Sequence, residues 1–115
     1  DTLIEANNYA ATLNELKRFE EARSLMRKTI PAAQRVLGTG NRFTLMMRWN
    51  YAEALYRAEG ATLDDLREAV TTLEDTERTA RRVLGGQNPT TKDIERDLRN
   101  ARAVLRVREM SQGVG

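Results

Sequence analysis

The side chains that could do chemistry here are carboxylates, guanidinium groups, amides and a few aromatics, because the 115 residues include no cysteine and no histidine. The chain therefore lacks the sulfur nucleophile, the commonest general base and the usual protein ligands of zinc. Asp64 and Asp65 could form an acid/base pair, but no nucleophile or base stands beside them. Thr62, three positions before Asp65, is instead typical of a helix N-terminus. We expect no catalysis, no metal and no cofactor, and we interpret these carboxylates as helix caps.

The composition excludes several other classes of function. Hydrophobic residues make up 40% of the chain and charged residues 31%, as in an ordinary helical globular protein. Lys and Arg number 19 against 17 Asp and Glu, and a formal charge of +2 does not favour nucleic acid. No signal-peptide pattern and no apolar run of about 18 residues occurs, so neither secretion nor a membrane is indicated. We expect a cytoplasmic protein.

The elements that must position these side chains are helices, because apolar residues recur at spacings of three and four. The pattern predicts five helices and no strands, near residues 2–16, 19–37, 43–58, 63–84 and 91–110, followed by a frayed tail at 111–115. Gly38 and Gly85 are expected to end the second and fourth helices. Pro31 predicts a bend near Thr29-Ile30 and not an end, because the apolar rhythm continues past it.

One apolar stripe on each helix is expected to face its neighbours. On the first helix the stripe comprises Leu3, Ala6, Tyr9, Ala10 and Leu13. Ala6 and Ala10 lie one turn apart and would let a second helix approach closely. On the second helix the stripe extends to Val36 and Leu37, and on the fourth to Val83 and Leu84.

Two stretches of the chain repeat. Arg35-Val36-Leu37-Gly38 returns 47 residues later as Arg82-Val83-Leu84-Gly85, and Asn8-Tyr9-Ala10 returns 42 residues later as Asn50-Tyr51-Ala52. The offset grows along the chain from 42 to 47 residues, because the segment around Ala58 to Thr62 is longer than the turn at the corresponding place in the first repeat. Two helical hairpins in tandem indicate a repeat protein of one domain, about residues 1–110.

These hairpins closely resemble the tetratricopeptide repeats of the kinesin light chain type, over residues 1–91. The resemblance implies an all-α superhelix of two hairpins, repeat 1 at about 2–38 and repeat 2 at about 43–85. It also implies a concave face, lined by the first helix of each pair, that holds peptide segments of partner proteins. Lys17 departs from the pattern by standing where the family usually has glycine, Pro31 by interrupting a helix, and residues 58–65 by extending a loop.

The last helix differs from the earlier ones. Leu98 and Arg99 occupy the places of Tyr51 and Ala52, and a long arginine cannot fit where the close-packed alanine does. We therefore interpret residues 91–110 as a capping helix whose outer side is solvated by a series of arginines at 96, 99, 102, 106 and 108. Asp and Glu residues interspersed among them favour a solvated face over phosphate binding.

The predicted peptide-binding groove follows from the resemblance, in which asparagines at the places of Asn8 and Asn50 hydrogen-bond a peptide backbone. Trp49 falls on the same face and could anchor a ligand side chain. The alternatives are that the asparagines cap polar groups along the groove and that Trp49 fills space against a neighbouring helix. Glu53 and Asp97 would oppose an acidic ligand. The predicted groove comprises Asn8, Asn50, Trp49, Glu53, Arg57, Arg96 and Asp97, and Asn7 and Tyr56 are among the residues expected around them.

The sequence thus predicts a scaffold that binds a protein or peptide ligand in its concave groove, with no nucleic acid and no membrane. The alternative function is a structural repeat segment that mainly stacks on further repeats or on itself. Because apolar positions near Ile4 have no further repeat to cover them, we also expect a weak, concentration-dependent homodimer.

Overall fold

The computed structural model describes residues 2–114, and these form five α-helices without any strand. The helices are α1 (Thr2–Glu15), α2 (Phe19–Leu37), α3 (Arg42–Arg57), α4 (Leu63–Leu84) and α5 (Pro89–Val114). The prediction of five helices is confirmed. Helix α5 continues through Val114, where the sequence predicted a frayed tail from residue 111. No helix in the described part of the chain has the length and apolar character needed to cross a membrane.

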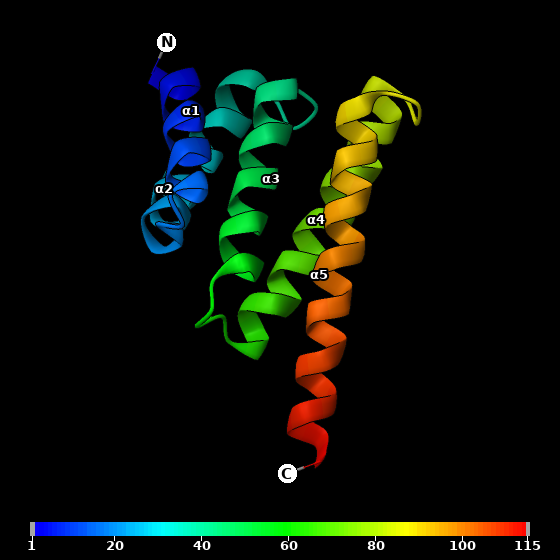
Figure 1. The fold of residues 1–115 in the computed structure, drawn as a ribbon. Helices are drawn as coiled ribbons and strands as arrows, with labels where there is room; N and C mark the ends of the chain where they lie inside the picture. Colours follow the sequence, from blue (N-terminus) through cyan, green and yellow to red (C-terminus); the bar gives the residue numbers. More distant parts are fainter. Residues whose placement is uncertain (1, 115) are drawn as a thin grey trace.

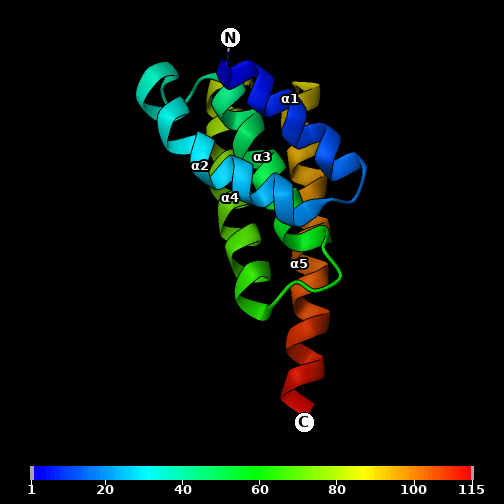
Figure 2. The same ribbon diagram turned by 90° about the vertical axis from the view of Figure 1, so that its left-hand side faces the viewer.

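The helices form two layers. Each helix packs against the next one along the chain, and α3 also packs against α1 and α5. Helices α1, α3 and α5 therefore make one layer, with α2 and α4 behind them (Figures 1 and 2). The C-terminal part of α5 projects past the ends of the other helices (Figure 1). The layer of α1, α3 and α5 carries all seven residues predicted to line the groove.

The two helix ends in the repeated Val-Leu-Gly stretches have matching backbone conformations. Gly38 and Gly85 follow α2 and α4 with φ angles of 90° and 94°, in the left-handed region that favours glycine. The next helix begins alike in both places, since the side chains of Asn41 and Asn88 each accept a 2.8 Å hydrogen bond from the backbone N–H two residues on. The internal repeat in the sequence is therefore also a repeat of local structure.

Helix α4 begins with the capping arrangement predicted for Thr62 and Asp65. The Thr62 hydroxyl accepts a hydrogen bond from the Asp65 backbone N–H, and the Asp65 carboxylate accepts one from the Thr62 backbone N–H, both at 3.0 Å. The interpretation of Asp65 as a cap is confirmed. Asp64 lies in the first turn of the same helix, where a negative charge is favourable.

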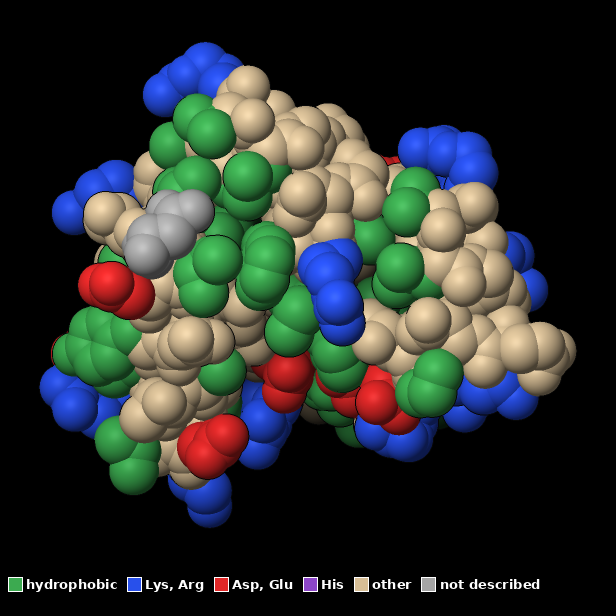
Figure 3. All heavy atoms as spheres, turned by 90° about the horizontal axis from the view of Figure 1, so that it is seen from above, with side chains coloured by type: hydrophobic (Ala, Val, Ile, Leu, Met, Phe, Trp, Pro, Cys, Tyr) green, Lys and Arg blue, Asp and Glu red, His purple; other side chains and the backbone are tan. Residues whose placement is uncertain are grey.

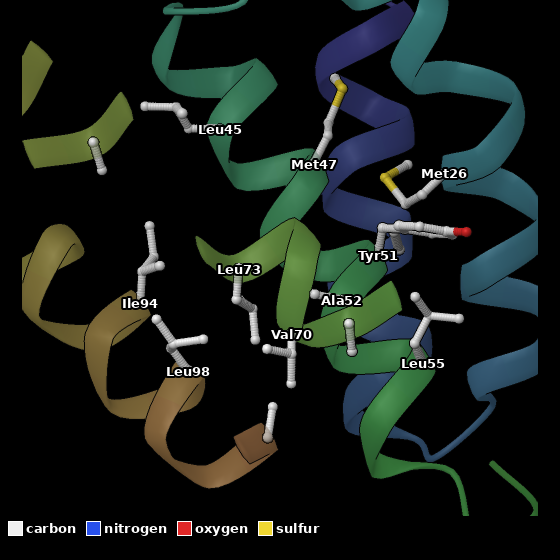
Figure 4. Packing of buried hydrophobic residues seen from close by; sticks show 14 of the residues in the cluster. Met26, Leu45, Met47, Tyr51, Ala52, Leu55, Val70, Leu73, Ile94 and Leu98 are labelled. Carbon is white, nitrogen blue, oxygen red and sulfur yellow. The ribbon is translucent and has the colours of Figure 1, made fainter. Parts of the chain in front are cut away.

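The core lies between the two layers. Met26 of α2, Met47 and Leu55 of α3, Leu73 of α4 and Ile94 of α5 are fully buried (Figure 4). Alanines fill the positions between these larger side chains and allow the helices to approach closely. Burying one such side chain stabilises a fold by roughly 1.5–3 kcal/mol. Because these residues come from successive helices, each helix depends on its neighbours for stability.

The apolar stripe predicted for α1 is only partly buried. Ala10 and Leu13 lie in the core, but Tyr9 is 52% exposed, whereas Tyr51 at the corresponding place on α3 is 7% exposed. Tyr51 is covered because it lies between α2 and α4, whose Arg27 and Glu68 it contacts. Among residues 2–114, no helix lies on the outer side of α1. Val36 was also predicted to be inward-facing, and it lies exposed in the last turn of α2.

The backbone of the α1–α2 hairpin shows how Lys17 and Pro31 are accommodated. Lys17, in the turn between the helices, has a φ of 62°, a left-handed conformation that side chains with a Cβ rarely adopt. Pro31 lies inside α2, which runs without interruption from Phe19 to Leu37. The prediction that the helix passes through Pro31 is confirmed.

Candidate functional site

Three asparagines join α1 to α3. The side-chain N–H of Asn50 donates to the side-chain oxygen of Asn7 at 2.8 Å, and the Asn14 side chain donates to the backbone carbonyl of Asn50 at 3.0 Å. Asn7 and Asn14 are only 2% and 3% exposed. Two of the three amides are therefore nearly closed to solvent, while Asn50 is partly exposed, and the contact is electrically neutral.

The contact between α3 and α5 uses the corresponding positions with different residues. Trp49 and Tyr56 stand 42 residues after Asn7 and Asn14, and Asp97 stands 47 residues after Asn50. The indole N–H of Trp49 donates to Asp97 Oδ2 at 2.6 Å. Burial raises the pKa of the Tyr56 phenol, and the charge of Asp97 and a hydrogen bond to it raise the pKa further. We call Trp49, Tyr56 and Asp97 the aromatic-carboxylate contact.

The aromatic-carboxylate contact differs from the amide contact in exposure and in charge. Its three side chains are partly exposed, so a ligand could reach them. No Lys or Arg among residues 2–112 forms an ion pair with Asp97, whose hydrogen-bond donors are neutral. In the view from above, several acidic side chains lie close together at the lower middle of the molecule (Figure 3). A half-buried carboxylate that forms no ion pair keeps an uncompensated negative charge, which is unfavourable away from water.

Glu53 and Arg57 extend the site by one and two turns along α3. The Arg57 guanidinium donates to Glu53 Oε2 at 3.0 Å and lies 5.4 Å from the centre of the Phe19 ring. The Glu53 side chain is 20% exposed. Burial raises the pKa of Glu53, and the charge of Asp97 raises it further. Glu53 and Asp97 are therefore close enough to repel each other, and Arg57 compensates the first of them.

Arg57 also borders a hollow of about 870 Å³ between the turn at residues 16–18 and the loop before α4. Several of the charged side chains in its lining are already paired within the chain. Arg18 pairs with Glu21, and Arg23 pairs with Glu20 and Asp65. These pairs leave the hollow with no clear preference for a ligand charge.

The predicted groove residues fall into three groups. Trp49, Glu53, Arg57 and Asp97 come together on α3 and α5. Asn50 takes part in the amide contact between α1 and α3. Asn8 is exposed on α1, and Arg96 turns to Asp93 on its own helix, at 3.1 Å.

Asn14 is absent from the predicted groove, whereas Tyr56 is among the residues expected around it. The signal that could have found Asn14 is the repeat itself, because Asn14 lies 42 residues before Tyr56 and seven after Asn7, two turns along the same helix face. A third polar contact joins α2, α3 and α4 at the edge of the core, where Tyr51 is buried and its two partners are exposed. The Tyr51 hydroxyl accepts a hydrogen bond from Arg27 at 2.7 Å and donates one to Glu68 at 2.5 Å.

This face offers hydrogen-bonding groups, charges and aromatic rings. The aromatic-carboxylate contact offers two aromatic rings and a carboxylate, and Glu53 and Arg57 add a second carboxylate and a guanidinium group. No set of three or more His, Cys, Asp or Glu side chains in the described part of the chain is placed to hold a metal ion. Comparisons with protein-family models, with curated proteins and with solved structures found no match to this chain.

Proposed function

We propose that the chain is a peptide-binding scaffold built as a tetratricopeptide-like superhelix. In this proposal α1–α2 and α3–α4 are two stacked hairpins and α5 is a capping helix. The face of α1, α3 and α5 binds a peptide segment of a partner protein. We place such a scaffold in the cytoplasm on the basis of its composition.

The observation that carries the proposal is the aromatic-carboxylate contact, which leaves Trp49, Tyr56 and Asp97 partly exposed on adjacent helices. Aromatic rings beside hydrogen-bonding groups are common anchors for partner side chains. The matched contact between α1 and α3 joins its helices with amides alone. Trp49 and Tyr56 also pack against the core, but their partly exposed surfaces and the carboxylate are more than helix packing requires.

The experiment is a selection of random peptides on the immobilised chain, followed by affinity measurements on the enriched sequences. Trp49→Ala should weaken their binding by more than tenfold, since an anchor residue contributes roughly 2 kcal/mol or more. Tyr9→Ala is the matched control, because it removes an exposed aromatic from the outer side of α1. Equal affinities of the two variants would place the binding site elsewhere.

A structural role in a longer stack is the second candidate, and the exposure of Tyr9 favours it. Tyr51 shows what covers this position inside a stack, namely the second helix of the preceding hairpin. Glu5 and Thr12 nevertheless stand on α1 where α3 carries Met47 and Ala54. This more polar face suits solvent better than a tight helix contact, so peptide binding remains the preferred proposal.

A further inference from the structure

We propose that the Asp97 carboxylate, with Trp49 and Tyr56 beside it, binds a lysine or arginine side chain of the peptide segment. This inference rests on the proposed function and names the ligand chemistry of the same face. Its starting point is that the structure contains the same helix contact twice, once with an amide and once with a carboxylate.

The amide contact shows what joining two helices requires at this position. Asn50 takes part in the α1–α3 contact through a neutral side chain, which donates to Asn7 at 2.8 Å. At the corresponding place Asp97 accepts from the Trp49 indole at 2.6 Å. An asparagine oxygen could accept that hydrogen bond equally well. The negative charge of Asp97 is therefore not needed to hold α3 and α5 together.

The neighbouring cations are already engaged with other partners. Arg57 donates to Glu53 and lies over the Phe19 ring, and Arg96 pairs with Asp93. With Glu53 compensated by Arg57, one negative charge is left over at Asp97. A cation that reaches this partly buried carboxylate gains a charge-assisted hydrogen bond, which is stronger than a bond between neutral groups.

The two aromatic residues complete the fit to a basic side chain. A lysine or arginine can lay its aliphatic part against a ring and its charge over a ring face. The chain makes such contacts itself, since Arg27 lies 5.6 Å from the centre of the Tyr51 ring and Arg57 lies 5.4 Å from that of Phe19. An acidic side chain would instead meet the repulsion of both Glu53 and Asp97.

Trp49 is the only tryptophan, so its fluorescence reports directly on this site. The probes are three blocked, alanine-based peptides of equal length, which carry two arginines, two citrullines or two glutamates. Citrulline has nearly the shape of arginine without its charge. We expect the arginine peptide to bind at least roughly tenfold more tightly than the citrulline peptide, and the glutamate peptide to bind most weakly.

Asp97→Asn should abolish the preference for arginine, because it removes the charge and keeps an acceptor for the Trp49 N–H. Asp64→Asn is the matched control, since it makes the same change of net charge at an exposed carboxylate on α4 and leaves the pair of Arg96 with Asp93 intact. It should retain the preference. If Asp97→Asn fails to fold, as circular dichroism would show, the comparison of arginine with citrulline on the unaltered chain still decides the case.

Two results would overturn the inference and leave the proposed function standing. One is equal or tighter binding of the citrulline or glutamate peptide, and the other is an arginine preference that survives in folded Asp97→Asn. Both proposals would fail together if no designed peptide changes the fluorescence of Trp49 and the random library yields no peptide that depends on this face.

Discussion

Buried amides such as those of Asn7 and Asn14 stabilise a fold only while each one keeps a hydrogen-bond partner. Asn50→Ala removes the donor to the Asn7 side chain, so we expect the free energy of unfolding to fall by roughly 1–3 kcal/mol. Asn8→Ala changes an exposed neighbour and should stay within about 0.5 kcal/mol of the unaltered chain. Urea unfolding of both variants tests this. Equal stabilities would mean that the buried amides find other partners.

The phenol of Tyr56 provides a prediction about pH. Its pKa is raised, first by burial and then by the charge of Asp97. Above about pH 10 the unfolded chain loses this proton while the folded chain keeps it, so stability falls as the pH rises. Tyr56→Phe removes this contribution, and its stability should fall less between about pH 8 and about pH 11. Tyr51 has a pKa raised in the same direction by burial, so some pH dependence should remain.

Urea unfolding of the Tyr56→Phe variant and the unaltered chain at both pH values gives the comparison. Parallel losses of stability in the two proteins would show that the Tyr56 phenol ionises alike in the folded and unfolded chains. A smaller loss in the variant would agree with the prediction.

At the scale of single residues, the sequence predicts which side chains share a face but not which hydrogen-bond partners they find. Trp49, Glu53 and Arg57 follow one side of a helix at spacings of four, so their proximity was predictable. The spacing says nothing of which acceptor the Asn50 amide finds. That choice depends on the distance between α1 and α3, which is set by packing across both layers.

The turn between α1 and α2 is an element in which one substitution is expected to increase stability. Lys17 holds a φ of 62° there, and a left-handed conformation costs a residue with a Cβ about 1 kcal/mol or more. Glycine adopts this conformation without that penalty but loses more chain entropy on folding. We expect Lys17→Gly to raise the free energy of unfolding by about 0.5–1 kcal/mol. Thermal and urea unfolding measure this, and a loss of stability would show that Lys17 makes contacts that outweigh its strain.

Helix α2 offers a second test, because Pro31 has no backbone N–H to donate to the carbonyl one turn earlier. Proline inside a helix is unfavourable by roughly 3 kcal/mol relative to alanine, although a bend can relieve part of this. Pro31→Ala should therefore increase stability by roughly 1–3 kcal/mol. Destabilisation would instead show that packing of Ile30 and Ala33 needs the bend predicted at this proline.

The ends of helices could be predicted from the sequence wherever a capping side chain or a glycine marks them. Gly38, Gly85 and the Thr62–Asp65 pair each fix an end through one local conformation or hydrogen bond. The C-terminal limit of α5 was less predictable, because the chain has no stop signal before Gly113. Contacts from other elements also support this part of α5. Arg108 donates to the Ala61 carbonyl at 2.6 Å, and Glu109 pairs with Arg67 at 3.5 Å.

Across the whole molecule, exposed apolar side chains lie at both ends of the helix layer. Tyr9 of α1 is exposed at one end, and Val107 and Met110 of α5 are exposed at the other. The exposure of Tyr9 could not be predicted from its own stripe, since covering it needs a helix on the far side of α1. A few exposed apolar side chains favour association at high concentration.

We expect a monomer at micromolar concentration and a weak dimer near millimolar concentration, as measured by sedimentation. Tyr9→Ser should weaken the dimer, and Val83→Ser, a matched apolar-to-polar change at the far end of the repeat, should leave it unaltered. A monomer throughout would rule out self-association. A dimer that persists at nanomolar concentration would move the structural role ahead of peptide binding.

The most direct test of peptide binding on the α1, α3 and α5 face is a map of amide and indole chemical shifts during titration with an enriched library peptide. Trp49 contributes a single indole N–H signal, which donates to Asp97 in the free protein. Binding at the proposed site should shift this signal and the amides around Glu53, Tyr56 and Asp97 more than any others. Largest shifts around Phe19 and Ala61, or on the outer sides of α2 and α4 with an unchanged indole signal, would contradict the proposed function.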